Sequence, residues 1–168
     1  VQSMKKKTAV LFVCLGNICR SPTAHGVFET LVHRARLASA IDVDSAGTGD
    51  WHIGHAPDKR TTQVALTKGY DLSHLRARLV TPADFDSYDY VVAMDRANLR
   101  DLEAMRPASF QGFLGLFLDF STQRTLSEVP DPYYGGDAGF EQVFNLVEDA
   151  SAGLLAHICQ QHGLVACH

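Results

Sequence analysis

The sequence predicts an α/β fold with a parallel sheet and right-handed crossovers. Short apolar stretches alternate with segments of helical periodicity from one end of the 168-residue chain to the other, which is the pattern of strand–helix–strand units. The first apolar stretch, TAVLFV at residues 8–13, is β-branched, aromatic and almost wholly apolar. Such a composition is typical of a strand that is covered on both faces. The length suits one domain with its own core.

The first half of the chain contains two predicted strands and two predicted helices. After the first strand, Ser21 and Pro22 are a typical helix start, with a hydroxyl at the cap and proline in the first turn. Apolar residues then recur at helical spacing to about residue 38. The alternating segment 41–47 (IDVDSAG) predicts a short strand, and 57–68 predicts a second helix.

The second half repeats this alternation. The segment 88–94 (YDYVVAM) predicts another buried strand, and Asp95 caps a helix that ends before Pro107. A further apolar run, 113–120 (FLGLFLDF), predicts a strand. A long loop rich in proline and glycine follows, and a last helix runs from residue 139 or 140 to about residue 160.

Several polar or reactive residues follow directly after predicted strands. Cys14 lies at the carboxyl end of the first strand, Ser45 near the end of the second, and Met94 and Asp95 at the carboxyl end of the third. In parallel α/β sheets, ligands bind outside the carboxyl ends of the strands. We therefore expect the functional site at this edge.

Composition excludes several classes of function. The net charge of −4 argues against a nucleic-acid partner, which would select a basic surface. No apolar run approaches the ~20 residues that cross a bilayer, so no membrane role is expected. The chain has four cysteines but no secretory signal, which predicts a cytoplasmic protein with reduced thiols. The cysteines do not have the spacing of a zinc finger, so no metal site is expected. Val1–Ser3 precede a methionine, and residues 1–7 are expected to be a disordered, partly vector-derived terminus before a single domain at 8–168.

The segment VLFVCLGNICRSPTA at residues 10–24 has the character of an anion site. A loop of small residues between a strand and a helix directs backbone N–H groups inward, and the helix start adds its positive dipole end. The Arg20 guanidinium suits two oxygens of a phosphate. In that field the Cys14 thiol should ionise readily, with Ser21 donating to the sulfur. The loop is therefore predicted to hold a nucleophilic thiolate against a phosphoryl group. The lysine and spacing of a Walker loop are missing.

A thiolate that attacks a phosphate monoester needs an acid to protonate the leaving oxygen. Asp131, in EVPDPYYGGD, is the best candidate because flanking prolines restrict its loop, although Asp-Pro is also an ordinary turn starter. Helix capping accounts for Asp95 without a catalytic role. Tyr133 and Tyr134 could form one wall of a deep slot, and Trp51, the only tryptophan, the other.

These segments resemble the low-molecular-weight protein tyrosine phosphatases, and the bacterial members most. The resemblance rests on VCLGNICRSP and DPYYGG, supported by VDSAGT, GHAPD and NLRDL, and covers residues 8 to 160. It implies a single domain with a four-stranded parallel sheet, helices on both faces and a phosphate-binding loop after the first strand. It also implies that Cys14 attacks phosphorus, that Arg20 binds the equatorial oxygens, and that Asp131 protonates the leaving phenol and then activates water.

The resemblance also implies roles around the loop. Gly16, Asn17 and Ser21 belong to the phosphate loop, and Asn17, Ser21, Ser45 and His74 match positions that hold its shape by hydrogen bonds. Cys19 matches a second loop cysteine that forms a reversible disulfide with Cys14. Residues around the substrate ring are Leu15, Ile18, Trp51, Tyr133 and Tyr134. No cofactor or metal is implied. The implied partners are tyrosine-phosphorylated proteins and a bacterial tyrosine kinase, with inorganic phosphate as product.

Three alternative functions compete with this one. Arsenate reductase uses a similar loop but needs further cysteines, and none lies between Cys19 and Cys159. Protein-arginine phosphatases typically have threonine at the position of Ile18, and isoleucine suits an aryl substrate better. A non-catalytic phosphate-binding module would not need Cys14, Arg20 and Asp131 together. The sequence thus favours a phosphotyrosine phosphatase.

Overall fold

The computed structural model describes residues 7–123, 126–133 and 137–165 of the chain. Its centre is a four-stranded sheet in the order β2-β1-β3-β4, with every neighbouring pair parallel. The strands are β1 (Thr8–Cys14), β2 (Ile41–Gly47), β3 (Tyr90–Ala93) and β4 (Phe113–Leu116). The predicted α/β class and parallel sheet are confirmed.

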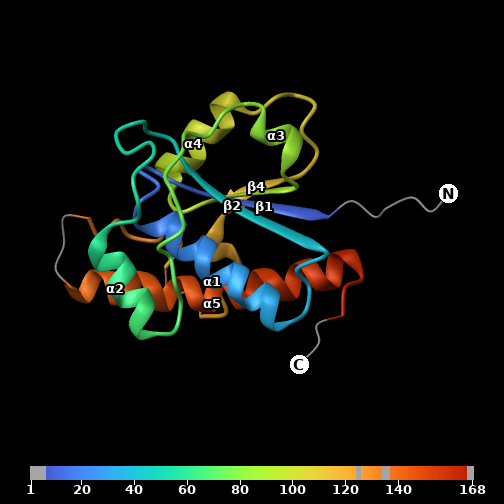
Figure 1. The fold of residues 1–168 in the computed structure, drawn as a ribbon. Helices are drawn as coiled ribbons and strands as arrows, with labels where there is room; N and C mark the ends of the chain where they lie inside the picture. Colours follow the sequence, from blue (N-terminus) through green and yellow to red (C-terminus); the bar gives the residue numbers. More distant parts are fainter. Residues whose placement is uncertain (1–6, 124–125, 134–136, 166–168) are drawn as a thin grey trace.

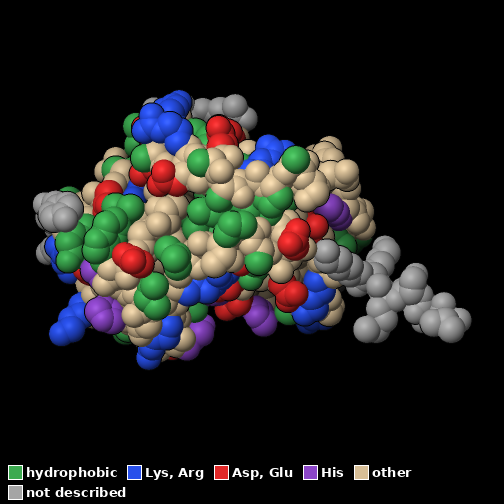
Figure 2. Space-filling view, turned by 90° about the horizontal axis from the view of Figure 1, so that it is seen from above, with side chains coloured by type: hydrophobic (Ala, Val, Ile, Leu, Met, Phe, Trp, Pro, Cys, Tyr) green, Lys and Arg blue, Asp and Glu red, His purple; other side chains and the backbone are tan. Residues whose placement is uncertain are grey.

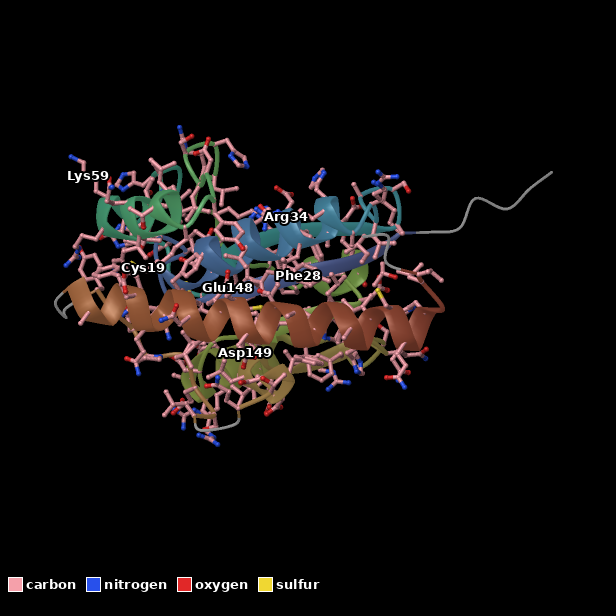
Figure 3. The ribbon with its side chains drawn as sticks, turned by 90° about the horizontal axis from the view of Figure 1, so that it is seen from below. Cys19, Phe28, Arg34, Lys59, Glu148 and Asp149 are labelled. Carbon is pink, nitrogen blue, oxygen red and sulfur yellow. The ribbon has the colours of Figure 1, made fainter. Side chains whose placement is uncertain are left out.

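Helices cover both faces of the sheet (Figure 1). One face carries α3 (Asp84–Ser87) and α4 (Arg96–Met105). The other carries α1 (Arg20–Arg34), α2 (Lys59–Thr67) and the long α5 (Asp137–His162). Figure 3, seen from below, shows α5 running across the molecule against α1. Among the described residues, no helix is both long enough and apolar enough to cross a membrane.

The alternation of side chains along β1 builds both cores. Val10, Phe12 and Cys14 belong to the cluster packed against α1 and α5, whereas Leu11 and Val13 belong to the cluster under α3 and α4. This period of two is the geometry of a strand. It explains the nearly continuous apolar run, because a residue on either face of this central strand is buried.

The strand order creates a crevice at the carboxyl end of β1. The chain passes from β1 to β2 on one side, whereas β3 pairs with β1 on the other. The connections after β1 and β3 therefore leave the sheet toward opposite faces, which is the topological switch point where α/β proteins bind ligands. In Figure 1 the loops after β1 and β2 lie at the left end of the sheet, away from the N-terminus.

Several element boundaries differ from the prediction. The first helix begins at Arg20 rather than after a Ser21 cap; Cys19 is the residue before it, and its side chain makes no capping hydrogen bond. The predicted strand 113–120 ends at Leu116 and continues as the 3-10 helix η1 (Phe117–Phe120). The last helix is longer at both ends. By contrast, the Asp95 cap is confirmed, with a complete capping box to Asn98. The expectation for the N-terminal segment concerns residues that lie, except for Lys7, outside the described part of the chain.

Candidate active site

The loop between β1 and α1 wraps around the Cys14 thiol. Cys14 is only 2% exposed, and its Sγ lies 3.0 Å from the Ser21 hydroxyl oxygen. The backbone N–H of Asn17 donates to the same sulfur over 3.3 Å. The Asn17 N–H favours negative charge on the sulfur that accepts it, and the Ser21 hydroxyl is close enough to donate a second hydrogen bond to a thiolate. The displaced helix start explains the position of Ser21, which faces the sulfur from inside the first turn instead of capping it.

Asn17 fixes the shape of this loop. It has a φ of 55°, in the left-handed region that asparagine tolerates better than most residues. Its side-chain amide donates to the Ser21 hydroxyl over 2.7 Å, and its side-chain oxygen accepts from the backbone N–H of Arg78 over 3.0 Å. A buried side chain with both ends bonded holds the loop in one conformation.

Arg20 projects from the first residue of α1 into the crevice and is 2% exposed. Its Nη1 donates to Asp95 Oδ2 over 2.6 Å and to the Val129 carbonyl over 3.1 Å. Its Nη2 lies 3.6 Å from Asp131 Oδ2. Burial alone would lower the pKa of Arg20, but the negative charge of Cys14 and the hydrogen bond to Asp95 raise it above its ordinary value. Arg20 is therefore a fixed positive charge beside the thiol.

Asp95 has a second role that sequence reasoning missed. One of its oxygens caps α4, and the other holds Arg20. The two residues are 75 positions apart, and they meet because β1 and β3 are neighbours and both end at this edge. In the sequence, helix capping is a sufficient explanation for an aspartate at position 95. The pairing of Asp95 with Arg20 becomes visible only once the order of the strands in the sheet is known.

Asp131 lies across the crevice from the cysteine loop. One carboxylate oxygen accepts the backbone N–H of Tyr133 over 3.0 Å, and the other faces the Arg20 guanidinium. Its side chain is 37% exposed, so it can meet both a bound group and solvent. This is the position that a group exchanging protons with a substrate and with water requires.

A cavity of about 350 Å³ joins these groups. Its floor is the cysteine loop, and its walls include Trp51 and Tyr133, whose exposed fractions are 66% and 36%. Gly49 lies beneath the Trp51 ring, where a Cβ would come within 2.0 Å of ring carbon Cζ3. The lining residues are Cys14, Leu15, Gly16, Ile18, Cys19, Arg20, Trp51, His52, Asp131 and Tyr133. Tyr134 lies outside the described residues, so its predicted place in the wall stays a prediction.

Cys19 is also buried and lines the cavity. Burial raises its pKa to about 12, against a smaller opposing effect of a hydrogen bond with Thr61. Cys19 is therefore a neutral thiol near pH 7, which leaves Cys14 as the candidate nucleophile of the pair.

The prediction that His74 supports the loop is wrong. Its side chain is 61% exposed, and its ion-pair partner is Glu29, at 3.9 Å. The buried histidine at this place is His25, whose Nδ1 lies 3.0 Å from the Ser45 hydroxyl. Ser45 itself lies near the end of β2 and bonds through its side chain to His25 rather than to the loop. The sequence could have indicated His25, because His25 lies four residues after Ser21 and therefore on the same face of α1 as Ser21.

His52 is a further residue of the cavity wall that the sequence did not reveal. Its ring centroid is 6.2 Å from that of Tyr133, and its Cδ2 would lie 3.0 Å from a Cβ at Gly16. Among residues 7–123, 126–133 and 137–165, no group of three or more His, Cys, Asp or Glu is placed to hold a metal ion. On the face shown in Figure 2, lysines and arginines are dispersed among acidic residues rather than gathered into a patch.

A buried cysteine in a strand–loop–helix turn, beside an arginine and opposite an aspartate, is the arrangement of the cysteine-dependent phosphatases. Comparisons agree: the family model for low molecular weight phosphotyrosine protein phosphatase matches residues 9–163. A protein of that name from Schizosaccharomyces pombe is 42% identical over 156 residues, or 92% of this chain and 99% of the relative. The chain belongs to the low molecular weight phosphotyrosine protein phosphatase family.

Two solved structures place the chain within the fold of this family. The crystal structure of YfkJ from Bacillus subtilis has a TM-score of 0.88 and 38% identity, covering 95% of this chain and 99% of that one. A crystal structure described as Drosophila arginine phosphatase has a TM-score of 0.82 and 32% identity, covering 88% and 96%. The predicted family and fold are confirmed.

Proposed function

We propose that this protein hydrolyses phosphotyrosine monoesters in proteins through a phosphocysteine intermediate. The observation that carries the proposal is the convergence of Cys14, Arg20 and Asp131 on one cavity. Family membership supports the reaction class. The geometry supports the assignment of roles, because each group has the chemistry and position that one step of such a reaction requires.

In the first step, Cys14 Sγ attacks phosphorus and the bond between phosphorus and the phenolic oxygen breaks. Backbone N–H groups of the loop and the Arg20 guanidinium bind the phosphoryl oxygens, where charge develops in the transition state. Protonated Asp131 gives its proton to the departing oxygen, so the leaving group is the neutral phenol.

In the second step, water attacks phosphorus on the side that the phenol has vacated. The ionised Asp131 carboxylate takes a proton from this water, the S–P bond breaks, and inorganic phosphate leaves. The electron pair of the S–P bond returns to Cys14, where the Asn17 N–H and the Ser21 hydroxyl stabilise the thiolate.

The walls of the cavity support an aryl substrate. Trp51 and Tyr133 offer rings, and Ile18 contributes an apolar side chain at the floor. Aromatic rings pack favourably in such a slot, whereas the cationic guanidinium of phosphoarginine would gain less from Ile18. The selectivity test is to compare kcat/KM for a phosphotyrosine peptide with that for its phosphoarginine counterpart, and we expect the phosphotyrosine peptide to be preferred.

The reducing cytoplasm is the proposed site of action, because the reaction needs Cys14 as a free thiol. Cys14, Cys19 and Cys159 are unpaired among the described cysteines. The proposed partners are proteins phosphorylated by tyrosine kinases, including a bacterial tyrosine kinase itself. Co-purification of phosphotyrosine proteins with a substrate-trapping Cys14→Ser variant would identify them.

The acid role of Asp131 predicts a dependence on the leaving group. In Asp131→Ala, kcat/KM for phenyl phosphate should fall by about 10²-fold, because a basic phenolate must leave without a proton. The loss for 2,4-dinitrophenyl phosphate should be much smaller, since that leaving group needs no proton. Asp101→Ala, an exposed aspartate on α4, is the matched control. An equal loss on both substrates would remove Asp131 as the acid.

Cys19 is the proposed partner of Cys14 in a reversible disulfide. Mild peroxide should inactivate the enzyme, and dithiothreitol should restore most of its activity, because a disulfide stops oxidation before the irreversible sulfinic acid. In Cys19→Ser the same treatment should leave a smaller recoverable fraction. Equal recovery in both proteins would argue against the protective role.

A further inference from the structure

Arg60, at the second position of α2, joins three parts of the site at once. Its guanidinium contacts Asp58 before the helix, Tyr133 in the loop that carries Asp131, and Phe140 in the first turn of α5. Nothing in the proposed reaction uses this arginine. Its contacts nevertheless converge on the segment whose position matters most for proton transfer.

Asp58 anchors Arg60 to the cysteine loop. Asp58 Oδ1 accepts from Arg60 Nε over 3.2 Å, and Oδ2 accepts from Nη2 over 3.2 Å, so the guanidinium is held in a two-pronged pair. The backbone N–H of Asp58 donates to the Ile18 carbonyl over 2.8 Å. Burial of Asp58 opposes ionisation, but the hydrogen bonds from Arg60 lower its pKa below the ordinary value, so the pair is ionised near pH 7.

On its other side Arg60 holds the loop of Asp131. Arg60 Nη2 donates to the Tyr133 carbonyl over 3.0 Å. The guanidinium carbon lies 5.7 Å from the centroid of the Tyr133 ring and 4.5 Å from that of Phe140, within the range of cation–π contacts. Tyr133 in turn donates its backbone N–H to Asp131 Oδ1. One side chain thus connects Asp58 with the residue that orients the acid.

Asp131 therefore lies between two anchors, each two residues away. On the N-terminal side, Val129 donates its N–H to the Met94 carbonyl over 2.8 Å and accepts from Arg20. On the C-terminal side, Tyr133 is held by Arg60. The first anchor ties the loop to Met94, the residue after β3, and to the phosphate-binding arginine. The second ties it to α2 and, through Asp58, to the cysteine loop.

We propose that Arg60 is a positioning residue that fixes the distance between the Asp131 carboxyl and the oxygen of the leaving group. The proposal rests on the assignment of Asp131 as the acid. A displacement of about 1 Å at a proton-transfer site is enough to lower a rate strongly. Arginine suits this position because its planar fork serves Asp58 and the Tyr133 carbonyl together and stacks on rings, which a lysine ammonium cannot do in the same way.

The test compares two leaving groups in three variants. In Arg60→Gln, kcat/KM for phenyl phosphate should fall about 10-fold, whereas kcat/KM for 2,4-dinitrophenyl phosphate should change about 2-fold or less. In Arg60→Lys, kcat/KM for phenyl phosphate should again fall more than kcat/KM for 2,4-dinitrophenyl phosphate, but by less than in Arg60→Gln. The control is Lys59→Gln, which removes a neighbouring charge that points to solvent at the end of α2 (Figure 3). This control should retain the full activity on both substrates, and the inhibition constant for inorganic phosphate should be unchanged in every variant.

A double variant separates positioning from a general structural effect. If Arg60 acts through Asp131, Arg60→Gln should cause no further loss on phenyl phosphate in an Asp131→Ala background, because there is no acid left to misplace. Independent, multiplicative losses would overturn the proposal, as would an equal loss of Arg60→Gln on both leaving groups or a weakened inhibition by phosphate. If Asp131→Ala alone shows no dependence on the leaving group, it is the assignment of the acid that fails, and Arg60 loses its proposed target with it.

Discussion

Cys14→Ser is expected to lower kcat on p-nitrophenyl phosphate by more than about 10⁴-fold, the scale on which loss of a nucleophile acts. A serine hydroxyl fits the same space but stays protonated near pH 7, whereas the proposed nucleophile is a thiolate in hydrogen-bond contact with the Asn17 N–H and the Ser21 hydroxyl. Binding of inorganic phosphate should persist, because Arg20 and the backbone donors of the loop remain.

A matched thiol control is available on α5. Cys159 is half-buried, far in sequence from the loop and outside the cavity lining. Cys159→Ser should therefore keep the full turnover. Retained turnover in Cys14→Ser, measured with EDTA present, would mean that another group attacks phosphorus.

Arg20→Ala should lower kcat/KM for aryl phosphates by about 10³-fold or more, the range seen when a preorganised cation or oxyanion donor is removed. Two effects add. The phosphoryl oxygens lose a forked donor, and Asp95, whose oxygen lies 2.6 Å from Arg20 Nη1, is left as an uncompensated negative charge beside the incoming dianion. The loss of kcat/KM should be equal for good and poor leaving groups, because in the proposed mechanism Arg20 binds the phosphoryl oxygens and does not contact the phenol.

The contribution of Asp95 can be separated. Asp95→Asn keeps a side chain able to cap α4 but removes the charge. The double variant Arg20→Ala, Asp95→Asn should bind inorganic phosphate more tightly than Arg20→Ala alone, as measured by calorimetry. Equal binding by the two proteins would show that the unpaired carboxylate does not repel the ligand.

The fold could be predicted because the composition of each strand segment matches the burial that its place in the sheet imposes. The apolar run of β1 and the alternation in β2 have the compositions that their places in a parallel sheet require. The start of α1 was misplaced for a physical reason. Ser21 has the chemistry of a cap, but in the structure its hydroxyl serves the sulfur of Cys14 while the loop ends one residue earlier.

The site was predictable where one short segment supplies it, and not where distant segments meet. Cys14, Asn17 and Arg20 lie within seven consecutive residues, in the loop after β1 and at the first residue of α1. Their spacing in the sequence is therefore enough to predict that they surround one site. The pairing of Arg20 with Asp95 and of Arg60 with Tyr133 joins residues more than 70 positions apart. Such contacts depend on strand order and on how α2 packs beside the late loop, which no local pattern encodes.

The histidine error has the same origin. His74 lies in a segment matched by resemblance, yet it projects to solvent toward Glu29. His25 occupies the buried position beside Ser45 because α1 turns that face toward β2. His25 lies on the same face of α1 as Ser21, and this helical spacing would have indicated His25 as the buried histidine. The resemblance to the family indicated His74 instead.

The covalent intermediate is the central claim, and trapping it is the most direct test. Asp131→Ala should slow hydrolysis of the intermediate, because no carboxylate is left to take the proton from water. After a rapid quench with 2,4-dinitrophenyl phosphate as substrate, mass spectrometry should find one phosphoryl group on the peptide that contains Cys14, and none in Cys14→Ser. A phosphoryl group on another residue, or burst release of dinitrophenol with no phosphorylated enzyme, would contradict the account.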